Sequence, residues 1–307
     1  MLRQTFLTLA NSNELKNVAT SNRAARKLAS RFIAGDTLPQ AVSVIRTLNA
    51  KGIKTTFDHL GENVTTHDEA VAAADSYIDI LNAIAEARLD SNVSLKLTQM
   101  GMDVDEELCY RNVERICARA RDTDNFVRID MESSAYTDRT LDLFRRLWHT
   151  DGYRNVGVVL QAYLYRTERD VREMNAEGVR VRLCKGAYNE PEEIAFPKKA
   201  DVDANFAKLT TILLREGNYP AIATHDSRLI SFTQRYSASK GIEPSRFEFQ
   251  MLNGVRPELH IELVKQGYNM RVYVPYGTEW YSYFMRRMAE RPANLVLLSR
   301  SLLQRTS

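Results

Sequence analysis

The chain has 307 residues, of which 44% are hydrophobic and 26% are charged, an ordinary composition for a globular protein. Its 42 basic and 39 acidic residues nearly balance, and no basic tract or aromatic-basic interleaving indicates a nucleic-acid partner. No apolar run reaches the roughly 18 residues of a membrane span, and the first residues show no signal-peptide cleavage site. Three cysteines without a CxxC pair predict a reducing, cytoplasmic setting.

The first 50 residues contain two helical patterns that stand apart from the rest of the chain. They are "NELKNVATSNRAARKLASRFI" (13–33) and "LPQAVSVIRTLNAKG" (38–52). We expect residues 1–50 to form a helical extension that packs against a catalytic domain of residues 51–307.

Eight short runs rich in β-branched residues follow, and a helical pattern comes after each. The predicted strands are 55–58, 93–97, 126–130, 156–161, 179–186, 221–225, 246–252 and 271–277. The predicted helices are 67–90, 103–121, 138–149, 166–177, 192–216, 226–240, 257–267 and 279–290. Strands that alternate with helices pair in parallel through right-handed crossovers. The pattern predicts an α/β fold, a (β/α)8 TIM barrel, with a doubly wound sheet as the competing arrangement.

The last predicted helix has two different faces at about 100° per residue. Its apolar face holds Trp280, Tyr281, Phe284, Met285 and Met288. The opposite face gathers Tyr283, Arg286, Arg287 and Glu290. Two arginines beside a phenol and a carboxylate are typical either of a solvated surface or of a binding site.

Active sites of such barrels lie at the C-terminal ends of the strands, and every predicted strand brings a polar residue there. These residues are Asp58, His59, Glu62, Lys96, Asp130, Gln161, Arg182, Lys185, Thr224, His225, Gln250 and Tyr273. With Arg286 and Arg287 added, the lysines and arginines of this set outnumber its aspartates and glutamates. This favours an anionic substrate or a phosphate-bearing cofactor, because arginine forks suit carboxylates.

Several other chemistries compete for such a rim. A metal site is weakly supported, because "DHLGE" (58–62) offers one histidine where barrel hydrolases place His-x-His. Acyl transfer lacks a G-x-S-x-G motif, and neither a P-loop nor G-x-G-x-x-G appears. A Schiff-base aldolase using Lys96 or Lys185 stays open, as does a catalytically silent barrel that acts as a binding module.

Six motifs stand on these strands and on the last helix. They are "RIDME" (128–132), "VLQAYL" (159–164), "VRLCKGAY" (181–188), "ATHD" (223–226), "FEFQML" (247–252) and "YFMRRMAE" (283–290). Through them the chain resembles the proline dehydrogenase family, in its monofunctional bacterial form, from about Asp58 to Leu295. The resemblance implies a distorted barrel whose last helix lies over the mouth.

The resemblance also implies the reaction and its partners. FAD, bound noncovalently, would oxidise L-proline to Δ1-pyrroline-5-carboxylate by hydride transfer from substrate C5 to flavin N5, the first step of proline catabolism. The electrons would pass to a membrane quinone, which implies peripheral contact of a cytoplasmic protein with the inner face of the membrane. A separate pyrroline-5-carboxylate dehydrogenase would take the product. No metal ion is implied.

Roles for single residues follow from the same resemblance. The substrate is expected to contact Lys96, Leu252, Tyr273, Tyr283, Arg286 and Arg287, and the arginines would grip its carboxylate. The cofactor is expected to contact Met131, Gln161, Arg182, Lys185, Gly186, Ala187, Thr224, His225, Gln250 and Glu290. The expected catalytic residues are Asp130, Arg182 and Tyr273, with Asp130 alternatively serving only to position Lys96. Glu62 and Arg286 would pair as a gate.

We predict that Arg286→Met raises the KM for proline about tenfold or more, because a bidentate contact with the substrate carboxylate is lost. Steady-state kinetics with L-proline measure the effect. An unchanged KM would contradict the carboxylate clamp.

Overall fold

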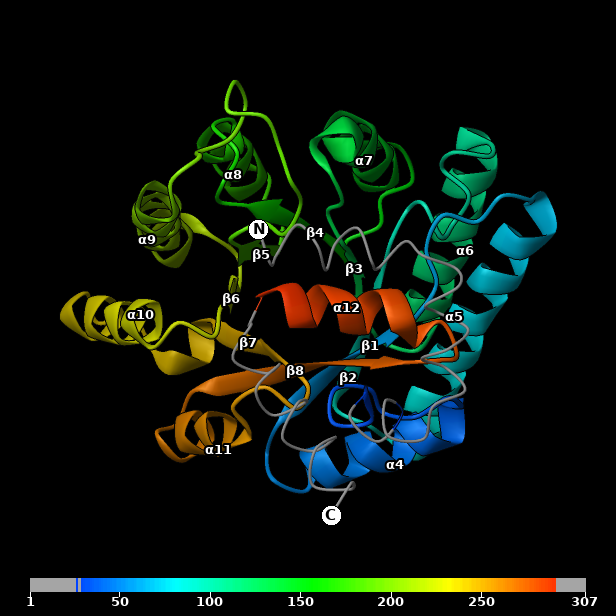
Figure 1. Cartoon of the computed structure of the whole chain (residues 1–307), viewed down its shortest axis with the longest axis horizontal. Helices are drawn as coiled ribbons and strands as arrows, with labels where there is room; N and C mark the ends of the chain where they lie inside the picture. The colour runs from blue at the N-terminus through cyan, green and yellow to red at the C-terminus, as the bar shows by residue number, and fades with distance from the viewer. Residues whose placement is uncertain (1–25, 27–28, 291–307) are drawn as a thin grey trace, which may run out of the picture.

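The eight predicted strands close into one parallel barrel that is surrounded by helices (Figure 1). The structure is a computed structural model that describes residue 26 and residues 29–290, with the side chains of residues 286–290 outside that description. The strands follow chain order around the barrel, and β1 pairs with β8 to close it. They are β1 (Lys54–His59), β2 (Ser91–Leu95), β3 (Val127–Ile129), β4 (Val156–Gln161), β5 (Val181–Cys184), β6 (Ala221–Ala223), β7 (Glu248–Leu252) and β8 (Asn269–Tyr276). The prediction of a (β/α)8 barrel is confirmed.

A helix follows each strand, and all but the last lie around the outside of the barrel (Figure 1). They are α5 (His67–Ala87), α6 (Glu106–Asp122), α7 (Thr137–Arg145), α8 (Thr167–Ala176), α9 (Lys199–Glu216), α10 (Ser227–Ser239), α11 (Pro257–Lys265) and α12 (Trp280–Glu290). Short helical turns are η1 (Ser134–Tyr136), η2 (Arg146–Thr150) and η3 (Pro244–Arg246). Polar caps fix some of the starts: Thr66 and Glu69 form a capping box on α5, and Asp105 accepts from two backbone N–H groups of α6.

The predicted helix 192–216 was wrong at its start, since α9 begins only at Lys199. The preceding residues run over the rim as a loop, in which Leu164 and Ala195 form an isolated antiparallel bridge. Pro197 explains the difference, because a proline disfavours helical backbone in the residue before it.

The second N-terminal helix is confirmed as α4 (Leu38–Asn49), which buries Ala41 and Ile45. It contacts β1 and β8, the two strands that close the barrel. Most of the first predicted helix, 13–33, lies outside the described residues. The division of the chain at residue 50 therefore stays a prediction.

Helix α12 lies across the centre of the barrel in Figure 1. Trp280, Phe284 and their neighbours on this helix form an apolar cluster with Phe32 and with Leu60, the residue after β1. Because Leu60 follows the C-terminal end of a strand, the cluster places the helix on the mouth side. Tyr283, expected on the polar face, is also buried in this cluster.

The barrel interior contains buried charged side chains as well as apolar ones. The guanidinium of Arg128 on β3 is buried and donates to the backbone carbonyls of Val158 and Arg180. Gly157 on β4 leaves the space for it. A Cβ at Gly157 would stand 2.3 Å from the carbonyl oxygen of Arg180 and 3.0 Å from Nη1 of Arg128. The absence of a side chain here is thus a packing requirement.

We predict that Gly157→Ala lowers the free energy of unfolding by about 3 kcal/mol, because backbone atoms cannot move aside as a flexible side chain can. Urea unfolding should show a lower midpoint at an unchanged m value. Gly61→Ala is the control, since its Cβ would meet only the end of the Gln99 side chain. Equal effects of the two substitutions would contradict this account.

Candidate active site

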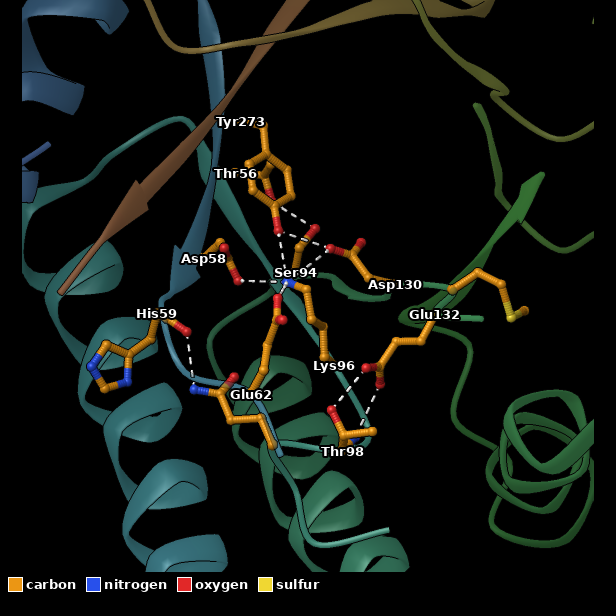
Figure 2. Close-up of polar contacts among 12 residues, drawn as sticks. Thr56, Asp58, His59, Glu62, Ser94, Lys96, Thr98, Asp130, Glu132 and Tyr273 are labelled. Atoms are coloured by element: carbon orange, nitrogen blue, oxygen red, sulfur yellow. Dashed lines mark hydrogen bonds and ion pairs between the residues drawn. The ribbon is translucent and has the colours of Figure 1, made fainter. Parts of the chain in front are cut away.

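Lys96 stands at the centre of the polar groups at the barrel mouth (Figure 2). It follows the last residue of β2, and its Nζ lies 3.4 Å from Oδ1 of Asp58 on β1. The same nitrogen lies 3.8 Å from Oδ2 of Asp130, after β3, and 3.9 Å from Oε1 of Glu62. It also donates to the Tyr273 hydroxyl of β8 at 3.3 Å. The strand ends therefore bring together side chains that are far apart in the sequence.

The charges around Lys96 keep it protonated. Burial alone would lower the pKa of Lys96, but the three neighbouring carboxylates outweigh it and raise the pKa above the usual lysine value. Asp58 is only 1% exposed, and burial raises the pKa of its carboxyl although Lys96 acts in the opposite direction. A cation held in this way can receive an anionic ligand.

Arg182 on β5 is held by hydrogen bonds from three of its nitrogens. Nη1 donates to Oδ1 of Asp130 at 2.6 Å, Nη2 donates to Oγ of Ser94 at 2.8 Å, and Nε donates to Oε1 of Gln250. The other oxygen of Asp130 accepts from the Tyr273 hydroxyl at 2.8 Å. The Arg182 guanidinium also lies over the Tyr273 ring, 5.5 Å from its centroid. The three expected catalytic residues thus form one network.

Gln161, at the end of β4, presents an unused acceptor to its surroundings. Its Nε2 donates to the backbone carbonyls of Met131 and Glu132, at 3.3 Å and 3.2 Å. Its Oε1 is buried and has no hydrogen-bond partner among the residues that the structure describes. A buried amide oxygen without a donor is unfavourable, so the site suits a ligand that carries an N–H group.

The backbone after β5 comes unusually close to a neighbouring aromatic ring. Gly186 has a φ of +110°, and a Cβ at this position would stand 2.3 Å from the ring of Tyr163. Only glycine fits such a conformation and such an approach. Gly186 therefore allows the chain that leaves β5 to pack directly against Tyr163.

Lys185 belongs to a second charged group at the ends of β5 and β6. Its Nζ pairs with Asp203 of α9 and lies 3.3 Å from Oδ2 of Asp226. Thr224 accepts from the backbone N–H of Asp226 at 3.1 Å. Asp203 could not be predicted as a site residue, since it lies within a helix and is distant in sequence from the strand ends.

His225 and Leu252 meet at the ends of β6 and β7. The backbone N–H of Leu252 donates to Nε2 of His225 at 2.9 Å. The acceptor nitrogen of the ring is therefore occupied within the protein, which fixes the position of the expected substrate contact Leu252.

Three predicted site residues lie on α12 but outside the described side chains: Arg286, Arg287 and Glu290. The carboxylate clamp and the Glu62–Arg286 gate therefore stay predictions. Glu62 itself lies 3.9 Å from Lys96, an ion pair that the sequence did not predict.

The geometry disfavours the competing chemistries. A Schiff-base lysine needs a lowered pKa, whereas carboxylates surround Lys96 and raise its pKa. Lys185 pairs with two carboxylates as well. Over the described part of the chain, no group of three or more His, Cys, Asp or Glu residues could hold a metal ion.

Known proteins resemble the chain over nearly its whole length. The family model described as proline dehydrogenase matches residues 41–300. The chain is 44% identical to proline dehydrogenase 2 of Bacillus subtilis over 293 residues, which cover 95% of this chain and 96% of that protein. It is 38% identical over 307 residues to the proline dehydrogenase of Deinococcus radiodurans, covering 99% of this chain and 98% of that protein.

Solved structures agree with these relatives. The crystal structure of proline utilization A (PutA) from Bdellovibrio bacteriovorus, inactivated by N-propargylglycine, matches with a TM-score of 0.79 and 26% identity. It covers 86% of this chain and 32% of the PutA chain. This chain thus spans about a third of that solved protein. From the family model and from relatives that match it end to end, the chain belongs to the proline dehydrogenase family, the enzymes that carry out proline oxidation as the first step of proline catabolism.

Proposed function

We propose that this enzyme binds FAD noncovalently at the ends of β4, β5 and β6 and oxidises L-proline to Δ1-pyrroline-5-carboxylate. The observation that carries the proposal is the Arg182–Asp130–Tyr273–Lys96 network, which fixes two cations at the mouth of the barrel. The bound flavin supplies the hydride acceptor, at N5, for the hydrogen on substrate C5. The protein supplies orientation and charge.

The residues present fit an isoalloxazine ring. Gln161 needs an N–H donor for its buried Oε1, and the oxidised ring carries an N–H group at N3. Gly186 lets the backbone after β5 pack closely against the Tyr163 ring, and this backbone would follow the ribityl and phosphate part of the cofactor. Lys185 and Thr224 stand at the neighbouring strand ends, in reach of the phosphate-bearing part of the cofactor. Met131, Ala187, His225 and Glu290 complete the proposed cofactor contacts.

Substrate binding is assigned to the cations on the other side of the mouth. Lys96 keeps its positive charge and binds the proline carboxylate together with Arg286 and Arg287. The apolar ring of the substrate packs on Tyr273, Tyr283 and Leu252. Holding the carboxylate in this way orients the substrate carbon that reacts.

Arg182, Asp130 and Tyr273 prepare the site for the change in charge. Arg182 would supply a positive charge to a bound flavin, and this charge would stabilise the anionic reduced ring. Asp130 holds that guanidinium with one oxygen and the Tyr273 hydroxyl with the other. Burial and the nearby carboxylate raise the pKa of Tyr273 well above its usual value, so Tyr273 stays a neutral phenol.

The electron acceptor and the product pathway are part of the same proposal. We assign a membrane quinone as the acceptor, reached by peripheral contact of a cytoplasmic protein with the membrane. In the part of the chain that the structure describes, no helix is long and apolar enough to cross a bilayer. The bifunctional protein PutA of Escherichia coli is 27% identical to this chain. The match covers 90% of this chain but 24% of PutA. We assign the next oxidation to a separate pyrroline-5-carboxylate dehydrogenase.

A visible spectrum of the purified protein tests the cofactor and the substrate together. We expect flavin absorption bands that bleach on addition of L-proline without oxygen and that respond weakly to 4-hydroxyproline. Flavin bands unchanged by proline would overturn the substrate assignment. Absence of flavin, even after FAD is added, would overturn the cofactor assignment.

We predict that Lys96→Met raises the KM for proline about 10- to 100-fold with a smaller change in kcat, because a charged contact with the carboxylate is lost. Lys208→Met is the matched control, since Lys208 is 57% exposed and pairs with Glu168. Steady-state kinetics and a thermal melt of each variant separate a binding defect from unfolding. An effect on KM that both variants share would refute the assignment.

A further inference from the structure

Glu248 is a buried acid below the proposed site, on the inner face of β7. It is 2% exposed, yet both of its oxygens accept hydrogen bonds. Nε of Arg271 on β8 lies 2.8 Å from Oε1 and 3.1 Å from Oε2. The Tyr219 hydroxyl donates to Oε2 at 3.2 Å, and Nε2 of Gln250 donates to Oε1. Burial would raise the pKa of Glu248, but the charge and hydrogen bond of Arg271 outweigh it and lower the pKa, so the carboxyl is an anion.

This anion selects the orientation of the Gln250 side chain. A glutamine amide has a donor end and an acceptor end, and it can turn either way. A carboxylate only accepts, so Glu248 takes the NH2 end. The oxygen end is thereby turned toward Nε of Arg182, which only donates. Gln250 is 4% exposed, so water cannot satisfy the amide in the reversed orientation.

The contact at Nε completes the hold on Arg182. Asp130 and Ser94 bind the two terminal nitrogens, and Gln250 binds the remaining one. Without the Gln250 oxygen, the guanidinium keeps its contacts with Asp130 and Ser94 but can turn about them. A series of side chains on β8, β7 and β5 thus links Arg271 and Glu248 to the cation at the mouth.

We infer that Glu248 is a positioning residue, which fixes Gln250 as the acceptor for Arg182 and thereby raises the reduction potential of the bound flavin. The inference rests on the proposed function, since it takes Arg182 to be the cation beside the flavin. Glu248 acts through Gln250 and touches neither substrate nor cofactor.

The direct effect of the Glu248 charge on the reduction potential of the flavin has the opposite sign to its effect through the positioning of Arg182. A negative charge at a distance disfavours the reduced ring, so removal of that charge alone raises the potential. Loss of positioning displaces the Arg182 cation and lowers the potential. The sign of the change therefore separates the two explanations.

The test uses the FAD-loaded full chain, with the flavin potential measured by equilibration with a reference dye. The double variant Glu248→Met/Arg271→Met removes one charge of each sign and leaves neither partner buried alone. We expect the equilibrium constant for flavin reduction to fall about tenfold, which is about 30 mV for two electrons. An unchanged or raised potential would overturn the inference.

Two further variants secure the result. Gln250→Met keeps the Glu248–Arg271 pair and must lower the potential as well; if it does not, the inference fails even where the double variant does not fold. Tyr219→Phe removes only a contact of Oε2, and its potential should equal that of the wild type.

The same experiment distinguishes this inference from the proposed function. A wild-type protein that takes up no FAD overturns both. Only the role of Glu248 is overturned if the wild-type flavin bleaches with proline while the double variant and Gln250→Met both keep the wild-type flavin potential.

Discussion

The pairing of Asp130 with Arg182 is the interaction on which the rest of the site depends. The two side chains project into the barrel from β3 and β5, and Nη1 lies 2.6 Å from Oδ1. Both are nearly buried, with 13% and 7% of the side chain exposed, so either one alone would carry a large desolvation cost. Asp130 also accepts from Tyr273 and lies near Lys96. One carboxylate thereby fixes the groups assigned to both cofactor and substrate.

The two-residue period of the strands divides the barrel interior into two levels. On β3, β7 and β8 the lower level holds Arg128, Glu248 and Arg271. Their hydrogen bonds join them to one another, to backbone carbonyls and, at Glu248, to Tyr219 and Gln250. Two residues later on the same strands, or just past their ends, come Asp130, Gln250 and Tyr273. The upper level holds Gln161 Oε1, a buried acceptor that has no partner among the described residues and is open to a ligand.

Much of this arrangement could be predicted from the sequence, because it depends on order and period. Eight alternating strands and helices predicted the barrel, and the ends of those strands predicted Lys96, Asp130, Arg182 and Tyr273 as neighbours. The partners of these residues could not be predicted in the same way. Asp203 reaches Lys185 from the second turn of a helix, and such a contact depends on how the helix packs. The loop before α9 was missed because helical spacing outweighed Pro197.

The ion pairs of Lys96 show why a buried cation can still receive a substrate. Asp58 is 1% exposed, and Asp130 is bound by Arg182 and Tyr273, so neither carboxylate can move without breaking buried contacts. Glu62 differs, since it lies at 3.9 Å, the longest of the three distances, with 20% of its side chain exposed. On the proposed function, a substrate carboxylate that replaces Glu62 leaves the two buried pairs intact and keeps the charge balance at Lys96. The exchange replaces only the longest of the three carboxylate contacts of Lys96, so the buried groups that position the cation keep their places.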